Sequence, residues 1–154
     1  MKALNSKRSD EYYTPEWVYR PLGKFDADYC ASDGSTIGVR NYTKSDDGLQ
    51  MEWRGFVWCN PPFSNKEPWI EKMKIHANGI MLLPASVSTP WFAELASHCG
   101  HVFFVGRKVN FINGSSSNFG GTCLFPFGED ALWRLRTTTL CGYIAKIEGY
   151  TPRG

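Results

Sequence analysis

The stretch Phe56-Val57-Trp58-Cys59-Asn60-Pro61-Pro62-Phe63 decides the fold, because a short apolar run ends there in a rigid turn. Residues 55–59 have the length and composition of a buried strand. In an open α/β sheet, ligands bind outside the carboxyl ends of the strands, which is where the turn 60–63 begins. We therefore expect this turn at the ligand-binding edge of a sheet.

The turn carries the groups needed to hold a planar amine. The Asn60 side-chain oxygen and the Pro61 backbone carbonyl are two hydrogen-bond acceptors, and Pro61 and Pro62 together restrict the backbone. Two acceptors can draw the amine hydrogens of a base out of the ring plane, and Phe63 can stack on an extruded base for about 1–3 kcal/mol. The pattern predicts methylation of an exocyclic amine. The same residues also fit an ordinary tight turn with Phe63 in the core.

Strand and helix signals alternate on both sides of this turn, which indicates an α/β protein. Short connections predict a single domain with a mostly parallel sheet flanked by helices on both faces. Thr14-Pro15 and Thr89-Pro90 each resemble an N-cap followed by proline in the first helical turn. Residues 108–121 are expected to form a loop or hairpin, and residues 132–147 have no clear assignment. The expected helices cover residues 15–22, 68–77 and 90–98, and the expected strands cover residues 25–30, 39–43, 55–59, 80–83, 102–105 and 122–127.

Composition sets further limits. A chain of 154 residues with 42% hydrophobic side chains is enough for one domain, expected to span residues 1–154 with residues 1–10 as a flexible arm. A net charge of +2 permits a nucleic-acid partner without requiring one. Residues 1–10 lack the apolar core of a signal peptide, and no run approaches the ~20 apolar residues of a membrane span.

The cysteines give no sign of a disulfide or zinc framework. The chain has five cysteines, an odd number, and they are scattered along the sequence, which is typical of reduced thiols in a cytoplasmic protein. His98-Cys99-Gly100-His101 lacks zinc-ligand spacing, so we interpret it as structural and expect no metal.

The chain resembles the phage-type DNA N6-adenine methyltransferases from about Glu11 to Gly128. Several motifs in the family's order carry this resemblance. It implies a Rossmann-like fold, S-adenosylmethionine as cofactor and double-stranded DNA as partner. It also implies that the protein acts in the cytoplasm of a bacterium or of a phage-infected host. The motifs are Tyr12-Tyr13-Thr14-Pro15, Phe25 to Ala31, Asp46-Asp47-Gly48-Leu49, Trp53, Val57 to Phe63, Leu82-Leu83-Pro84-Ala85, Trp91-Phe92, Gly106-Arg107 and Phe111.

The resemblance also implies which residues contact the cofactor. Asp28 and Asp47 are the leading polar contacts, and Asp26 and Asp46 are nearby alternatives. The further candidates are Tyr12, Thr14, Pro15, Ala31 and Asn60. Each aspartate on its own also fits a solvated turn, and the Gly-x-Gly loop common in methyltransferases is missing after the first strand, where the nearest glycine is Gly34.

A polar segment after residue 105 is the candidate DNA contact. Arg107 is the strongest candidate, followed by Lys108 and Asn118, because such side chains contact the phosphate backbone. A solvated hairpin loop is the alternative. No separate target-recognition domain is expected in this length.

The residue pattern leaves other functions open. An Asn-Pro-Pro-aromatic turn selects a planar amide or amine, so a protein glutamine amide or an RNA base amine are alternative substrates. A catalytically silent module that binds cofactor or nucleic acid is a further alternative.

Overall fold

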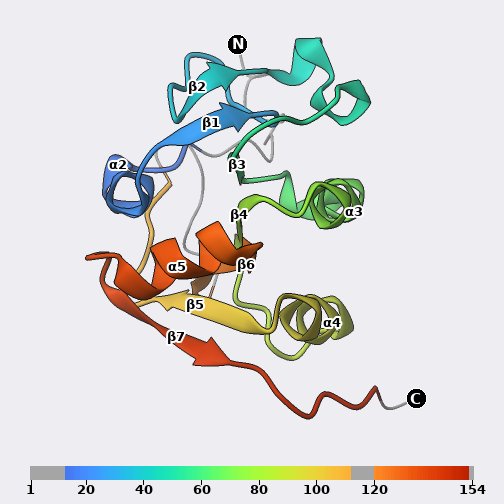
Figure 1. The fold of residues 1–154 in the computed structure, drawn as a ribbon, viewed down its shortest axis with the longest axis vertical. Coiled ribbons are helices and arrows are strands. Elements are labelled where there is room, and N and C mark those ends of the chain that lie inside the picture. The colour runs from blue at the N-terminus through green and yellow to red at the C-terminus, as the bar shows by residue number, and fades with distance from the viewer. Residues whose placement is uncertain (1–12, 112–119, 153–154) are drawn as a thin grey trace, which may run out of the picture.

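The computed structural model describes residues 13–111 and 120–152. In this part of the chain one seven-stranded sheet has the order β2-β1-β3-β4-β6-β5-β7 (Figure 1). The strands are β1 (Phe25–Asp28), β2 (Gly38–Asn41), β3 (Val57–Cys59), β4 (Gly79–Pro84), β5 (His101–Val105), β6 (Thr122–Phe127) and β7 (Gly142–Lys146). The α-helices are α2 (Glu16–Tyr19), α3 (Glu67–His76), α4 (Pro90–Cys99) and α5 (Glu129–Thr137), and the 3-10 turns are η1 (Arg20–Leu22), η2 (Lys44–Asp46), η3 (Gly48–Gln50) and η4 (Phe63–Asn65).

The sheet is mixed, so the prediction of a mostly parallel sheet was wrong. β1 pairs in parallel with β2 and with β3, and β3 pairs in parallel with β4. β6 lies between β4 and β5 and is antiparallel to both, and β7 is antiparallel to β5. A parallel neighbour requires a crossover connection. The described residues between β5 and β6 contain no helix, and β6 returns beside β5 in the opposite direction.

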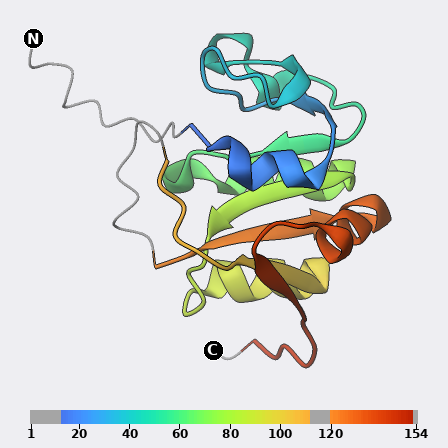
Figure 2. The same cartoon turned by 90° about the vertical axis from the view of Figure 1, so that its left-hand side faces the viewer.

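The helices cover both faces of the sheet, as predicted. Figure 1 shows α2 on one side of the sheet and α3 and α4 on the other, and Figure 2 shows α2 and α5 on the same face. Alternate side chains of the strands enter two apolar clusters. The first cluster takes Trp69, Ile70 and Met73 from α3 and Phe92, Leu95 and Ala96 from α4. The second takes Val18 and Leu22 from α2 and η1 and Ala131 and Leu135 from α5.

The expected helices and strands are confirmed within a few residues at their ends. The structure adds α5 and β7 in the stretch that the sequence left unassigned. Thr14 is not the N-cap of the first helix, because α2 begins at Glu16 with Pro15 as its N-cap residue. The described residues contain no helix long and apolar enough to span a membrane.

The strand order places a crevice beside β1. The chain passes from β1 to β2 on one side and then returns to β3 on the other side of β1. Such a reversal of direction leaves an opening at the carboxyl ends of the two central strands, where open α/β sheets bind ligands. These ends are Asp28 and Cys59, so the turn that follows Cys59 lies beside this opening.

The close approach of β3 and β4 gives a test of the fold. A Cβ atom on Gly79 would lie 2.2 Å from the Val57 carbonyl oxygen. Gly79→Ala should therefore lower the free energy of unfolding by about 1–3 kcal/mol, measured by urea denaturation. Gly120→Ala is the control, because a Cβ there would meet nothing within 4 Å. Equal stability of the two variants would contradict the packing of β3 against β4.

Candidate active site

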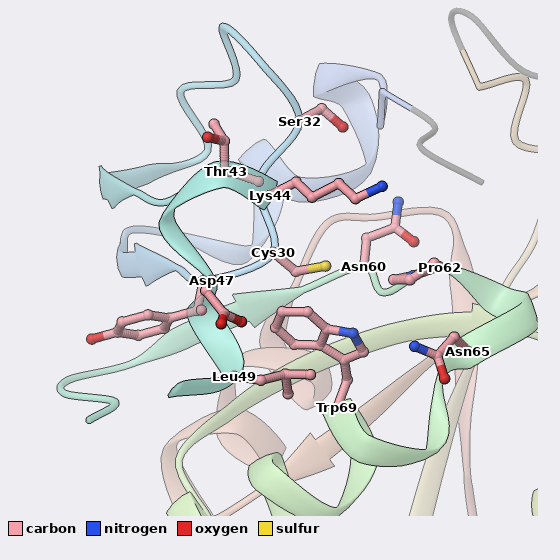
Figure 3. A pocket seen from close by; sticks show the side chains of 13 residues that line it. Cys30, Ser32, Thr43, Lys44, Asp47, Leu49, Asn60, Pro62, Asn65 and Trp69 are labelled. Atoms are coloured by element: carbon pink, nitrogen blue, oxygen red, sulfur yellow. The ribbon is translucent and has the colours of Figure 1, made fainter. Parts of the chain in front are cut away.

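A cavity of about 370 Å³ opens at the carboxyl ends of β1 and β3 (Figure 3). Three stretches of backbone and one helix form its walls. They are the residues after β1, the η2–η3 segment, the turn after β3, and α3. The lining residues are Tyr29, Cys30, Ala31, Ser32, Thr43, Lys44, Asp47, Gly48, Leu49, Asn60, Pro62, Asn65 and Trp69.

Asp47 is held at the rim of the cavity by unusual backbone geometry. It joins η2 to η3 in the left-handed region, with φ 56° and ψ 65°. Non-glycine residues in that region are strained, and such strain clusters at functional sites. The next residue, Gly48, has no room for a side chain, because a Cβ would lie 1.9 Å from the Tyr29 carbonyl oxygen. The Trp53 indole donates to the Gly48 carbonyl at 3.0 Å and fixes this segment against the core.

Asn60 is oriented by a hydrogen bond across the fold. Its side-chain nitrogen Nδ2 donates to Thr14 Oγ1 at 3.0 Å, which joins residues 46 positions apart. Thr14 is buried and Asn60 is half-buried, so this bond is partly shielded from solvent. Because the amide nitrogen is directed at Thr14, the amide oxygen is turned to a different side. The hydroxyl that the sequence suggested as a helix cap thus orients the candidate catalytic amide.

Lys66 holds the turn after β3 against α4. Its Nζ lies 4.7 Å from the centroid of the Trp91 ring, 3.4 Å from the Phe63 carbonyl oxygen and 3.3 Å from Glu67 Oε2. The lysine side chain is only 13% exposed. A cation at the N-terminus of a helix opposes the helix dipole, so these contacts offset an unfavourable position at the start of α3. They fix the backbone of Phe63.

Asp28 is a buried carboxyl group at the end of β1. Its Oδ1 accepts a hydrogen bond from the Cys30 backbone N–H at 2.9 Å. Burial raises the pKa of Asp28 to about 7, and the Cys30 hydrogen bond offsets part of that effect. Burial also raises the pKa of the Cys59 thiol, with the nearby Cys30 thiol adding to the effect. A shifted carboxyl beside a cavity is typical of a functional site.

A family model described as DNA N-6-adenine-methyltransferase (Dam) matches residues 2–123. The chain belongs to this family. The DNA N-6-adenine-methyltransferase of Escherichia phage T1 is similar to it, with 31% identity over 131 residues that cover 78% of this chain and 55% of the relative. The chain therefore spans about half the length of that relative. No solved structure gives a significant match.

The structure of this Dam-family chain brings several of the expected cofactor residues together. Ala31, Asp47 and Asn60 line the main cavity. Thr14 and Asp28 line a smaller neighbouring cavity that Asn60 also borders. Of the expected catalytic residues, Pro62 lines the main cavity with Asn60, Pro61 is buried, and Phe63 packs against both apolar clusters.

Other expected residues lie elsewhere. Asp26 Oδ2 accepts the backbone N–H of Phe56 at 2.8 Å, and Asp46 Oδ2 accepts that of Thr43 at 2.8 Å, so both carboxylates fix backbone turns and line neither cavity. Pro15 is the N-cap of α2. Arg107 and Lys108 are exposed after β5. The predictions for Tyr12 and Asn118 fall outside the described residues.

The sequence did not identify several residues that line the main cavity. Trp69 belongs to the first apolar cluster, and it is both buried and part of the cavity wall. Lys44 precedes the Asp46-Asp47 pair by few residues, and in Figure 3 its side chain extends toward Asn60. Its proximity in sequence to this acidic pair is the signal by which Lys44 could have been identified. The further residues are Tyr29, Cys30, Ser32, Thr43, Gly48, Leu49 and Asn65.

The burial of Asp28 predicts how stability depends on pH. The folded chain holds the Asp28 proton up to about pH 7, whereas the unfolded chain loses it near the ordinary pKa of 3.8. Stability should therefore fall as the pH rises between these values. Asp28→Asn removes the buried charge and should raise the free energy of unfolding at pH 8 by about 2–4 kcal/mol, with the gain vanishing near pH 4.

The measurement is denaturant unfolding at both pH values. Asp47→Asn, which removes an exposed carboxylate at the main cavity, is the control and should not reproduce the gain at pH 8. Equal destabilisation of Asp28→Asn at both pH values would show that the hydrogen bond to Cys30 outweighs burial.

Proposed function

We propose that this chain transfers a methyl group from S-adenosylmethionine to the N6 amine of an adenine in double-stranded DNA. One observation carries the proposal. An Asn-Pro-Pro-Phe turn follows β3 at the rim of the cavity, and the Asn60 amide nitrogen is engaged by Thr14. Family membership and the name of the phage T1 relative favour adenine in DNA over a protein amide or an RNA base.

The fold supports the cofactor assignment. The cavity lies where the chain reverses direction across β1, which is the ligand-binding position of Rossmann-like sheets, and we assign the sheet to that methyltransferase type. Its volume of about 370 Å³ is in the range of small-molecule sites. Leu49, Trp69 and Ala31 supply apolar walls for an adenine, and the exposed Asp47 carboxylate supplies acceptors for hydroxyl groups.

The bound cofactor supplies an electrophilic methyl group, and the chain's own residues orient the amine. With Nδ2 directed at Thr14, the Asn60 oxygen is the acceptor for one amine hydrogen. The Pro61 carbonyl accepts the other. Together they hold the amine hydrogens away from the methyl donor, so that the nitrogen lone pair faces it. No strong base is needed, because the nitrogen becomes acidic once methylated.

We place the DNA contacts on the same edge of the sheet. We assign stacking on a flipped adenine to the half-buried Phe63, whose carbonyl accepts from Lys66 Nζ at 3.4 Å. Arg107 follows β5, and its guanidinium lies 4.2 Å from the centroid of the Trp17 ring. Such stacking holds a cation at the surface, where it can meet a phosphate. We assign Arg107 and Lys108 to phosphate contacts, with Asn118 as a further candidate.

Removing the Asn60 amide tests the catalytic assignment. Asn60→Ala should lower kcat for methyl transfer to unmethylated DNA by about 10²–10³-fold, because one of two amine acceptors is lost. Transfer of labelled methyl from S-adenosylmethionine measures the rate, and calorimetry should show cofactor affinity within a few-fold of wild type. Labelling of RNA or protein but not DNA by the wild-type chain would refute the substrate. No labelling of any of them would favour a silent binding module.

Adjacent aspartates provide a matched test of the cofactor site. Asp47→Asn should weaken S-adenosylmethionine binding about tenfold or more, because a hydrogen bond to a charged acceptor is lost. Asp46→Asn is the control, since its side chain caps η2 outside the cavity and asparagine retains an acceptor for Thr43. Calorimetric titration compares the two. Equal losses would place the cofactor elsewhere.

A further inference from the structure

The indole of Trp58 carries a buried polar group that no residue in the described part of the chain satisfies. Its Nε1–H is buried and has no hydrogen-bond partner among the described residues. Buried polar groups nearly always have a partner, which is either protein or ordered water. This unsatisfied donor therefore indicates a bound group that accepts a hydrogen bond from it.

The surroundings of Trp58 are suited to such a group. Trp58 lines a small cavity of about 20 Å³, separate from the main cavity. That volume is enough for one water molecule and too small for a whole base. Polar side chains of Thr14, Ser32 and Asp28 share the lining.

Strand register places the key groups on one side of the sheet. Asp28 and Trp58 are direct partners in the parallel pairing of β1 with β3. Side chains at paired positions point to the same face, so the carboxyl group and the indole are neighbours. The buried Thr14 hydroxyl reaches the same cavity while accepting from Asn60 Nδ2.

We propose that this cavity binds one ordered water molecule, which accepts from Trp58 Nε1–H and donates to Asp28 and to Thr14 Oγ1. The water ties the end of β1 to the Thr14–Asn60 hydrogen bond and so holds the Asn60 amide in one orientation. Trp58 is then a positioning residue for Asn60. This functional role rests on the proposed methyl transfer, whereas the water site itself does not.

Nuclear magnetic resonance of the cofactor-free protein tests the water site directly. The Trp58 indole proton should show a cross-relaxation peak to a long-lived water, despite being buried. The Trp53 indole is the internal control, because it is also buried and donates to the Gly48 carbonyl, so it should show none. Absence of the Trp58 peak overturns the site. Loss of the peak when S-adenosylmethionine is added also overturns it, because the cavity would then hold part of the cofactor.

Kinetics test the positioning role. Trp58→Phe should lower kcat about five- to tenfold through loss of one hydrogen bond, while KM for S-adenosylmethionine changes less than twofold. Ile80→Val is the control, because Ile80 is the buried partner of Trp58 on β4 and the change removes volume without a polar group. A similar fall in kcat for both variants, or a rise in KM alone, would show a packing role only. Failure of wild-type protein to methylate DNA would refute the proposed function and leave the water result standing.

Discussion

The parallel pairing of β1 with β3 is the constraint on which the site depends. It sets Ala27 opposite Val57 and Asp28 opposite Trp58, so both strands end at the same level and the turn at Asn60 emerges beside the end of β1. Since side chains alternate along a strand, a shift of one residue would move Trp58 to the other face and turn Cys59 toward α2. The two apolar clusters oppose that shift, because Trp58 belongs to one and both Val57 and Cys59 belong to the other.

Three unfavourable features lie close to where that pairing ends. A carboxyl group is buried at Asp28, a non-glycine residue is left-handed at Asp47, and a cation is mostly buried at Lys66. The ion pair of Arg20 with Glu16, by contrast, is exposed and contributes little to stability. Proteins tolerate buried charge and backbone strain chiefly where function requires them. Asp47 lines the main cavity and Asp28 the smaller one beside it, so these two features support a binding role independently of sequence similarity.

Local sequence signals predicted the elements that flank the site and missed features that depend on tertiary contacts. Strand β3 and the helices that begin with Glu67-Pro68 and Pro90 carry strong apolar or proline signals. Strand β7 is mostly exposed, so it shows little apolar pattern, and its pairing partner β5 lies about 40 residues earlier. The insertion of β6 between β4 and β5 also depends on contacts between residues far apart in the sequence. The alternation of strands and helices could predict the α/β class but not the antiparallel direction of β6.

The same limit applies to individual site residues. The motif at Asn60 was visible because its chemistry is contained in four consecutive residues. The family resemblance ranked Asp28 and Asp47 above Asp26 and Asp46, but the residues alone could not exclude the second pair, since an aspartate that caps a backbone turn and one that lines a cavity look alike in sequence. Only the fold shows which of each pair faces the crevice.

Two cations beside the site, Lys66 and Arg107, are held in different ways, although the net charge of the chain is small. Lys66 and Arg107 each lie over a tryptophan ring, on α4 and α2, which cover opposite faces of the sheet. Lys66 is mostly buried and bound to the Phe63 carbonyl, so its charge is directed at the turn rather than at solvent. Arg107 is exposed at the end of β5, next to the exposed Lys108. Arg107 and Lys108 thus present their charges to solvent, whereas the charge of Lys66 stabilises the turn after β3.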